Sequence, residues 1–258
     1  ADMPGTVRNA ATGFPVGNKG YITTGYNPDQ KYLADTWEYD PETNTWRQMD
    51  DFKGGARYYA LGFGIDNYGY VGTGYNDNYL KDFYRFDPTA AAGSQWTIVN
   101  GFGGQKRQGA TAFVIDGKAY VCGGQNNNSD VSDFWRFDPS AATPWTQLRD
   151  IANTSDDDYD DDYTSIVRSY GVSFVIDGKA YLTLGSTAGG SYYSNYWSYD
   201  PETDLWEGDD LTAFEGSTRI HAVCFSTGTR GIIATGGSGS SSYFDDTWEL
   251  KPYEYEEE

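Results

Sequence analysis

The stretch that decides the fold is RQGATAFVIDGKAYVCGG, residues 107–124. Up to Ile115, small and large side chains alternate, which is typical of a β-strand. Asp116-Gly117 then provides a strong signal for a two-residue hairpin turn. A second apolar run follows the turn and ends at Gly123-Gly124. The stretch therefore predicts two antiparallel strands, a and b, that are joined by a tight turn.

The same spacing returns five times along the 258 residues. Each copy has an Arg, a Phe six positions later and a Gly seventeen positions later. The arginines are Arg8, Arg57, Arg107, Arg168 and Arg219. An aromatic-rich strand c follows each Gly, and a Trp on a strand d closes four of the copies. A Gly- and Trp-rich repeat of about fifty residues predicts an all-β β-propeller with five four-stranded blades, which fills residues 1–258 as a single domain.

Turn signals recur at the a–b position of the other copies. Asp177-Gly178 repeats the hairpin in copy four, and Asn18-Lys19-Gly20 and Asn67-Tyr68-Gly69 are the expected turns of copies one and two. The first residues of the chain match residues 50–57, so that Ala1 takes the place of Asp50. A Trp-bearing strand would precede this point in a complete repeat. Six blades are therefore the alternative if an N-terminal segment is missing.

These motifs resemble the kelch repeat. The resemblance rests on the Gly pair after strand b, an aromatic-x-aromatic-Asp strand and a Trp shortly after it, and it covers all five copies. The Gly pair is complete at Gly123-Gly124 and Gly236-Gly237, and the fifth copy lacks the closing Trp. The overall style is similar to secreted or surface-attached kelch proteins of bacteria. The resemblance implies a periplasmic, cell-surface or extracellular location, although no leader is visible.

The chain is strongly acidic, with a formal net charge of −20. Nucleic acids and anionic lipids need Lys and Arg to neutralise their phosphates, so we expect neither as a partner. No apolar run is long enough for a membrane span. The expected partner is a glycan or a protein, and the expected state is a monomer.

The five arginines recur in every copy, which favours a structural role such as bonding to loop carbonyls. The alternative is a ring of guanidinium groups that binds an acidic ligand. Loops between strands b and c vary most, and they share one face with the d–a loops and with the arginines. Variable loops on a repeated scaffold are the usual place for binding. The residues predicted to contact a ligand there are Tyr26, Tyr58, Tyr75, Tyr192, Tyr193 and His221, with the five arginines as the alternative set.

The largest break in the repeat is the acidic stretch from Asp156 to Asp162, in the d–a connection before Arg168. Its carboxylates predict a solvated, disordered loop, with a Ca²⁺ site as the alternative. The chain has a single His and two separated Cys, which cannot supply a closed zinc or copper site. We therefore expect no cofactor and no transition metal.

Kelch propellers include copper radical oxidases that resemble galactose oxidase, sialic-acid mutarotases and pure binding modules, and the fold alone does not choose among them. The oxidase site of that family requires two His ligands, so one His excludes it. No nucleophile elbow, P-loop or zinc-protease motif occurs. The sequence therefore favours a non-catalytic binding module on the b–c and d–a loop face. The alternative is an enzyme of the sugar mutarotase or epimerase type that uses arginines at the channel mouth.

Overall fold

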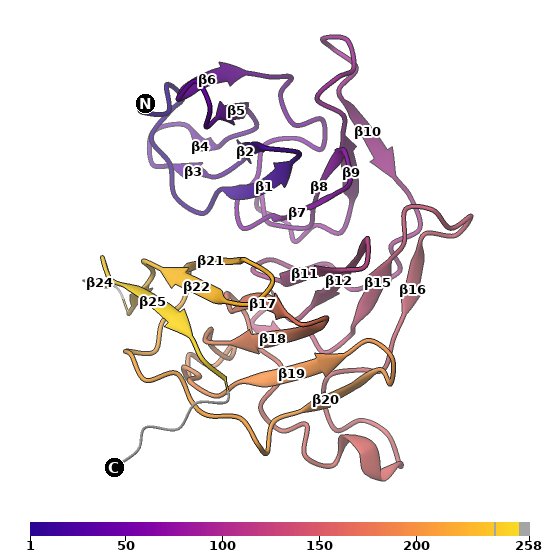
Figure 1. Cartoon of the computed structure of the whole chain (residues 1–258). Helices are drawn as coiled ribbons and strands as arrows, with labels where there is room; N and C mark the ends of the chain where they lie inside the picture. Colours follow the sequence, from indigo (N-terminus) through magenta and orange to yellow (C-terminus); the bar gives the residue numbers. More distant parts are fainter. Residues whose placement is uncertain (240, 253–258) are drawn as a thin grey trace. The chain divides into compact units, whose positions relative to one another are not determined.

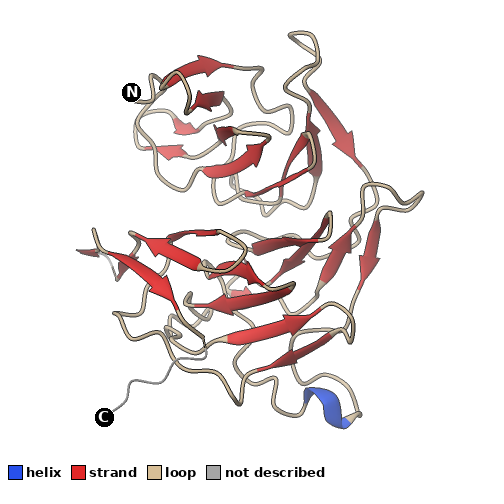
Figure 2. Ribbon diagram, viewed as in Figure 1, coloured by secondary structure: helices blue, strands red, loops and turns tan. Residues whose placement is uncertain are grey.

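The computed structural model describes residues 1–239 and 241–252, so that Ser240, in the last expected b–c loop, lies outside the described residues. The described chain is all-β apart from one short 3-10 turn, η1 (Asp158–Asp160) (Figure 2). It forms two compact units, residues 1–109 with 138–145, and residues 110–137 with the described residues from 146 onward. The expectation of a single domain over residues 1–258 stays a prediction. Each repeat gives one antiparallel sheet, and we call the sheets blades one to five.

Blades one and two each contain four strands in up-and-down order (Figure 1). Blade one consists of β1 (Thr12–Val16), β2 (Lys19–Thr23), β5 (Thr36–Asp40) and β6 (Thr45–Gln48). Blade two consists of β7 (Leu61–Ile65), β8 (Tyr68–Gly72), β9 (Phe83–Phe86) and β10 (Trp96–Val99).

Blades three and four follow the same order. Blade three consists of β11 (Thr111–Ile115), β12 (Lys118–Cys122), β15 (Trp135–Phe137) and β16 (Trp145–Gln147). Blade four consists of β17 (Val172–Ile176), β18 (Lys179–Thr183), β19 (Trp197–Asp200) and β20 (Leu205–Glu207). Blade five has three strands within the described residues: β21 (Val223–Ser226), β22 (Gly231–Ala234) and β25 (Thr247–Leu250). The presence of only three strands among its described residues agrees with the lack of a closing Trp in the fifth repeat.

An aromatic pair fixes the register between strands a and b. Phe14 lies opposite Tyr21 with the rings stacked at 5.5 Å, and Phe113 lies opposite Tyr120 at 5.2 Å. Phe63 and Phe174 form the same kind of pair with Tyr70 and Tyr181. In blade five the partner of Phe225 is Ile232 instead. Because cross-strand pairs stabilise a sheet on one face, this repeated pair aligns each hairpin.

The register also places the a–b turns. Asp116-Gly117 and Asp177-Gly178 are the turn residues, as predicted, and all four have positive φ angles, which a tight hairpin of this kind requires. In blades one and two the expected turns are wrong by one or two positions. Val16 pairs with Lys19 and Ile65 pairs with Tyr68, so the turns are Gly17-Asn18 and Asp66-Asn67. The Asn-x-Gly signal overlapped the first residues of strand b.

The core lies between neighbouring blades. Phe14 of blade one packs edge-on against Phe86 and Trp96 of blade two. In the second unit, Phe113 of blade three packs against Tyr199 and Trp206 of blade four. All six side chains are at most 4% exposed. Aromatic side chains bury a large area each, so this packing between sheets accounts for the high aromatic content of the chain.

The b–c loops are folded into small ribbons rather than open coil. Three of them contain a pair of two-residue strands: β3 (Tyr26–Asn27) with β4 (Lys31–Tyr32), β13 (Gln125–Asn126) with β14 (Ser129–Asp130), and β23 (Gly237–Ser238) with β24 (Ser242–Tyr243). Single bridges, Tyr75 with Tyr79 and Ser186 with Tyr192, do the same in blades two and four. A shared backbone frame therefore presents the variable residues.

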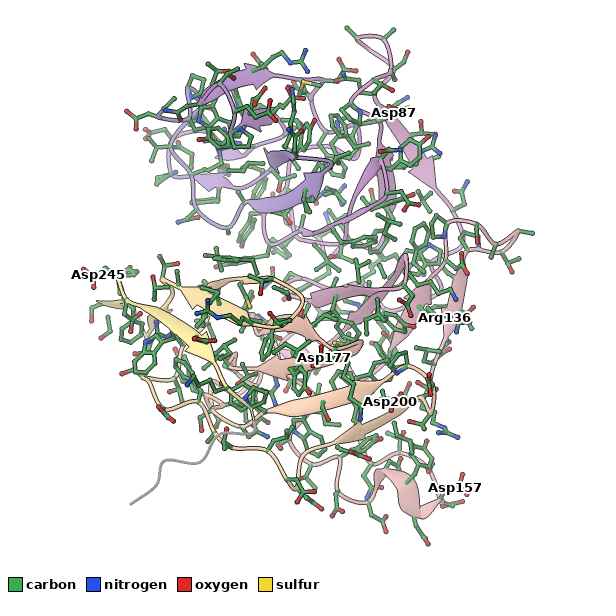
Figure 3. All side chains as sticks on the ribbon, viewed as in Figure 1. Asp87, Arg136, Asp157, Asp177, Asp200 and Asp245 are labelled. Carbon is green, nitrogen blue, oxygen red and sulfur yellow. The ribbon has the colours of Figure 1, made fainter. Side chains whose placement is uncertain are left out.

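The acidic stretch before blade four is folded, which corrects the expectation of a disordered loop. Asp160 is fully buried, and its carboxylate accepts hydrogen bonds from the backbone N–H groups of Thr154 and Ser155, both at 2.9 Å, and from the Ser155 hydroxyl at 3.0 Å. These bonds hold the pKa of Asp160 below its ordinary value against the effect of burial. The loop is thus organised around one internal carboxylate, while Asp157 beside η1 is exposed (Figure 3).

Candidate functional site

The repeated arginine links several segments of the chain by hydrogen bonds, as Arg57 shows. The Arg57 side chain is 1% exposed, and its guanidinium donates hydrogen bonds to the carbonyl oxygens of Gly55, at 3.2 Å, and Thr73, at 2.9 Å. Two further hydrogen bonds, at 2.6 and 2.9 Å, reach the carboxylate of Asp82 at the start of strand c. A planar guanidinium suits such a two-pronged contact with a carboxylate. One side chain thereby joins the entrance of strand a, the end of strand b and the start of strand c.

The other arginines repeat this arrangement. Each donates to the carbonyl two residues earlier: Arg8 to Thr6, Arg107 to Gln105, Arg168 to Ile166, and Arg219 to Ser217. Arg8 also binds the carboxylate of Asp35, Arg219 binds that of Asp246, and Arg168 binds the side-chain oxygen of Asn195. Bonding to loop carbonyls, predicted from the recurrence of the arginines, is therefore confirmed. Their contact with a ligand stays a prediction.

The backbone carbonyl of four of the arginines also accepts a hydrogen bond from the Gly of the repeat before it. The carbonyl oxygen of Arg57 accepts a hydrogen bond from the N–H of Gly25, and that of Arg107 accepts one from Gly74, both at 2.8 Å. Gly124 and Gly185 bond in the same way to Arg168 and Arg219. The φ angles of these glycines lie between 86° and 114°, a region that favours glycine. The Arg–Gly spacing thus has a structural cause.

The residue before the repeated Gly of each blade, Gly236 of blade five included, also has a left-handed backbone. It is Thr24, Thr73, Gly123, Leu184 and Thr235 in blades one to five. The Gly pair of the repeat therefore corresponds to Thr235-Gly236 in blade five, and the sequence assignment to Gly236-Gly237 is one residue out of register. Only blade three has glycine at both positions. There, a Cβ on Gly123 would stand 2.3 Å from the carbonyl oxygen of Arg168.

Five tyrosines come together over blades one and two, and we call them the tyrosine platform. Its members are Tyr26, Tyr32, Tyr58, Tyr75 and Tyr79. The Tyr58 ring is central: it stacks on Tyr32 with ring centroids at 5.6 Å and an angle of 6°, lies 5.6 Å from Tyr26, and meets Tyr75 edge-on at 5.7 Å. All five are half-buried, so each keeps part of its surface in solvent. The structure thus brings together three of the predicted contact residues, Tyr26, Tyr58 and Tyr75.

Two neighbouring loops hold the platform in place. The Tyr32 hydroxyl donates a 2.6 Å hydrogen bond to the carboxylate of Asp77, which raises the pKa of Tyr32 and keeps its hydroxyl protonated. Burial likewise raises the pKa of Tyr58. The Asn27 side chain accepts hydrogen bonds from the backbone N–H groups of Asp29 and Gln30 and so closes its own loop. The rings are therefore set before a ligand arrives, which lowers the entropy cost of binding.

Sequence reasoning missed Tyr32, Tyr79 and Asp77. Tyr32 and Tyr79 each stand one residue before the Leu that bonds back to the first Gly of its loop, Leu33 to Gly25 and Leu80 to Gly74. The Tyr-Leu pair in two successive loops was the available signal. It was hidden because the two loops differ in length, so that the tyrosines do not align by counting from the Gly.

The predicted contact residues of blades four and five each have different contacts. The Arg168 guanidinium lies 4.6 Å from the centre of the Tyr193 ring. The backbone N–H of Tyr193 donates a hydrogen bond to the carbonyl oxygen of Gly185, just as the N–H of Leu33 donates to Gly25 in blade one. Tyr193 therefore takes the place in its loop that Leu33 takes in blade one. The Tyr192 hydroxyl accepts a hydrogen bond from the N–H of Gly239 at 2.8 Å.

His221 is exposed, has a φ of 60°, and meets the ring of Tyr170 edge-on at 4.6 Å. Tyr170 in turn accepts a hydrogen bond from the Gln125 side chain at 2.7 Å. Three successive blades of the second unit are joined in this small polar cluster. Ligand contact by Tyr192, Tyr193 and His221 stays a prediction.

Among residues 1–239 and 241–252, no three His, Cys, Asp or Glu side chains gather closely enough to hold a metal ion. Within the same residues, no helix has the length and apolar character that crossing a membrane requires. The expectations on cofactors and on Ca²⁺ at Asp156 to Asp162 stay predictions.

Comparison with known proteins bears on the family. A model of the kelch motif matches residues 15–53 and 106–148. A solved structure titled "Structure of YjhT" aligns over 96% of this chain and 82% of its own, with a TM-score of 0.77 and 15% sequence identity. At that identity the likeness shows the fold alone. A comparison with curated protein sequences finds no match. The fivefold repeat, the sheets that it forms and these matches together show a β-propeller fold in which two stretches of the chain match the kelch motif.

Proposed function

We propose that this chain is a binding module whose ligand, a glycan or a segment of a protein, lies on the tyrosine platform. The observation that supports the proposal most strongly is the convergence of five tyrosines from the b–c loops and a strand entrance of two adjacent blades. Tyrosine is the residue that binding loops favour, because it offers a large rigid ring at a low entropy cost together with a hydroxyl.

The chemistry of the platform suits a ligand with both apolar faces and hydroxyl or amide groups. The rings offer stacking surfaces, and their hydroxyls both donate and accept hydrogen bonds. The exposed Asp77 carboxylate adds an acceptor beside Tyr32. The pyranose rings of a glycan and the backbone of an extended peptide both meet these requirements.

The enzymatic alternative receives less support from the geometry. A mutarotase that recognises a sugar carboxylate would need guanidinium groups open to its substrate. The side chains of Arg57 and Arg168 are about 1% exposed and that of Arg219 is fully buried. All three guanidinium groups already donate hydrogen bonds to backbone carbonyls and to an Asp or Asn side chain of the chain itself. Binding without catalysis is therefore the function that we propose.

The direct test is to apply the purified full chain to a glycan array and to a peptide array. The proposal predicts selective retention of one ligand class, with binding competed by the same ligand free in solution. A low dependence on salt is also expected, because stacking and neutral hydrogen bonds are little affected by screening. Binding that occurs only to strongly charged ligands and disappears at high salt would contradict the platform as the site.

A further inference from the structure

A second candidate site lies entirely within the other unit, at the outer part of blade four. It is a groove of about 340 Å³ between strands β19 and β20, the acidic loop and the loop that follows β20. Its volume falls in the range of small-ligand pockets, which begins at about 300 Å³. The acidic loop provides one wall, and this is the segment that stretches the Arg-to-Arg spacing from 50 residues, 57 to 107, to 61, 107 to 168.

Rigid aromatic side chains form the floor of the groove. Trp197, Trp206 and Tyr163 are 4–5% exposed, and the Tyr163 ring meets the Trp197 ring edge-on at 5.9 Å. The Tyr163 hydroxyl accepts a 2.7 Å hydrogen bond from the backbone N–H of Trp206. Gly208 lies flat against Trp197, because a Cβ there would stand 3.2 Å from the indole. The aromatic floor is thus fixed by packing and by hydrogen bonds.

Carboxylates surround this floor. Four of the eleven lining residues are acidic, namely Asp162, Glu207, Asp209 and Asp210, and no lysine, arginine or histidine belongs to the lining. Asp162, Glu207, Asp209 and Asp210 are all exposed at the rim. Negative charge over aromatic faces attracts an organic cation in two ways, by ion pairing and by the interaction of the cation with the ring. The field of a chain with a net charge of −20 adds to this attraction.

The chain already places one of its own cations on an aromatic ring of this groove. The Arg149 guanidinium lies 4.7 Å from the centre of the Tyr159 ring, and it donates a hydrogen bond to the carbonyl oxygen of Thr203 at 3.2 Å. Tyr159 also meets Tyr163 edge-on at 6.0 Å. The aromatic cluster at this edge of blade four therefore accommodates a guanidinium group in the folded protein.

We propose that this groove binds a guanidinium or alkylammonium group, carried by a basic side chain of a peptide or by a free amine. The cation lies among the carboxylates of Asp162, Glu207 and Asp209, with its stem against the aromatic floor. The site is distinct from the tyrosine platform in residues and in ligand charge. Its test therefore fails or succeeds independently of the proposed function.

Calorimetric titration of the full chain at low ionic strength tests the proposal. The probes are N-acetyl-arginine amide, N-acetyl-lysine amide and the uncharged N-acetyl-norleucine amide. We expect the two cations to bind about tenfold or more tightly than the norleucine compound, and the affinity to fall as salt is raised. A trilysine peptide and spermidine, titrated in parallel, distinguish a peptide source from a free amine. Equal binding of all three amides would overturn the proposal.

A pair of matched variants separates the groove from general electrostatics. Glu207→Gln with Asp209→Asn removes two charges from the rim, and Asp156→Asn with Asp157→Asn removes two exposed charges from the acidic loop outside the lining. The first variant should lose about fivefold or more in affinity for the cations, and the second should change less than about twofold. Thermal unfolding checks that both remain folded. An equal loss in both variants would show that only the overall charge attracts the probes.

Discussion

The b–c loops of the first unit and those of the second unit share one backbone frame and differ in what they present. In blades one and two the frame carries the tyrosine pairs Tyr26 with Tyr32 and Tyr75 with Tyr79. At the same paired positions the second unit carries Gln125 with Asp130, Ser186 with Tyr192, and Gly237 with Tyr243. The same bridges form in both units. The comparison teaches that the frame depends on the arginines and glycines, whereas the presented side chains vary without changing it.

The largest effect is expected from breaking the frame. Arg57→Ala leaves the buried carbonyl of Thr73 and the carboxylate of Asp82 without their donor, and should lower the free energy of unfolding by about 3–5 kcal/mol. Arg230→Ala removes an arginine that is 55% exposed and pairs with Glu249 on the surface, and should cost about 1 kcal/mol or less. Urea unfolding followed by fluorescence measures both. Similar losses in the two variants would argue against a frame held by the repeated arginine.

The next effect distinguishes blade three from the other blades. Gly123→Thr should cost about 2 kcal/mol or more, because the added Cβ would collide with the carbonyl oxygen of Arg168. The reverse exchange, Thr73→Gly, should change stability by less than about 1 kcal/mol, since the left-handed backbone suits glycine and the buried Thr73 hydroxyl has no hydrogen-bond partner. Denaturant unfolding of both variants provides the measurement. A well-tolerated Gly123→Thr exchange would mean that the link between blades three and four can relax.

The smallest effect concerns acid sensitivity. Hydrogen bonds from Arg219, and then from Trp248, lower the pKa of Asp246 to about 2, below the value of about 3.9 for an unperturbed Asp. A lowered pKa in the folded state contributes stability above the unfolded pKa, and this contribution is lost as the pH falls toward 2. Asp246→Asn copies the Asn195 of blade four, which does not titrate. The difference in unfolding free energy between the parent chain and this variant should therefore be present at pH 6 and shrink steadily below about pH 4. A difference that does not depend on pH would contradict this role of Asp246.

Much of the fold could be predicted because the signals repeat. The strands, the hairpins at Asp116-Gly117 and Asp177-Gly178, and the equivalence of Ala1 with Asp50 were all readable. The Trp46 and Trp96 indoles donate to the carbonyl oxygens of Ala1 and Asp50 respectively, both at 3.1 Å, which confirms that equivalence. Turns with an ambiguous Asn-x-Gly signal were misplaced, because register is decided by the aromatic pair across the strands and not by the turn residues alone.

The residues of the candidate site were harder to predict from the sequence than the fold, for a physical reason. Which of two adjacent loop residues faces solvent depends on the local pairing, and loop lengths vary between blades. Tyr192 and Tyr193 are neighbours, but the pairing places Tyr193 over Arg168. Likewise, the burial of the arginines follows from long-range bonds to Asp35, Asp82 and Asp246, residues 25 to 27 positions away. Because the sequence alone does not reveal those contacts, it is compatible with either a structural or a ligand-binding role for the arginines.

The measurement that tests the central claim most directly compares loop tyrosines of the two units in ligand binding. With a ligand from the arrays, Tyr26→Ala combined with Tyr75→Ala should weaken binding by about 1–3 kcal/mol and leave the melting temperature nearly unchanged. Tyr243→Ala, at the position in blade five that corresponds to Tyr32, removes a side chain that is 81% exposed and should leave affinity unaltered. If the double variant of the platform binds as the parent chain does, while Tyr243→Ala or a change at the hairpin end abolishes binding, the ligand does not lie on the tyrosine platform.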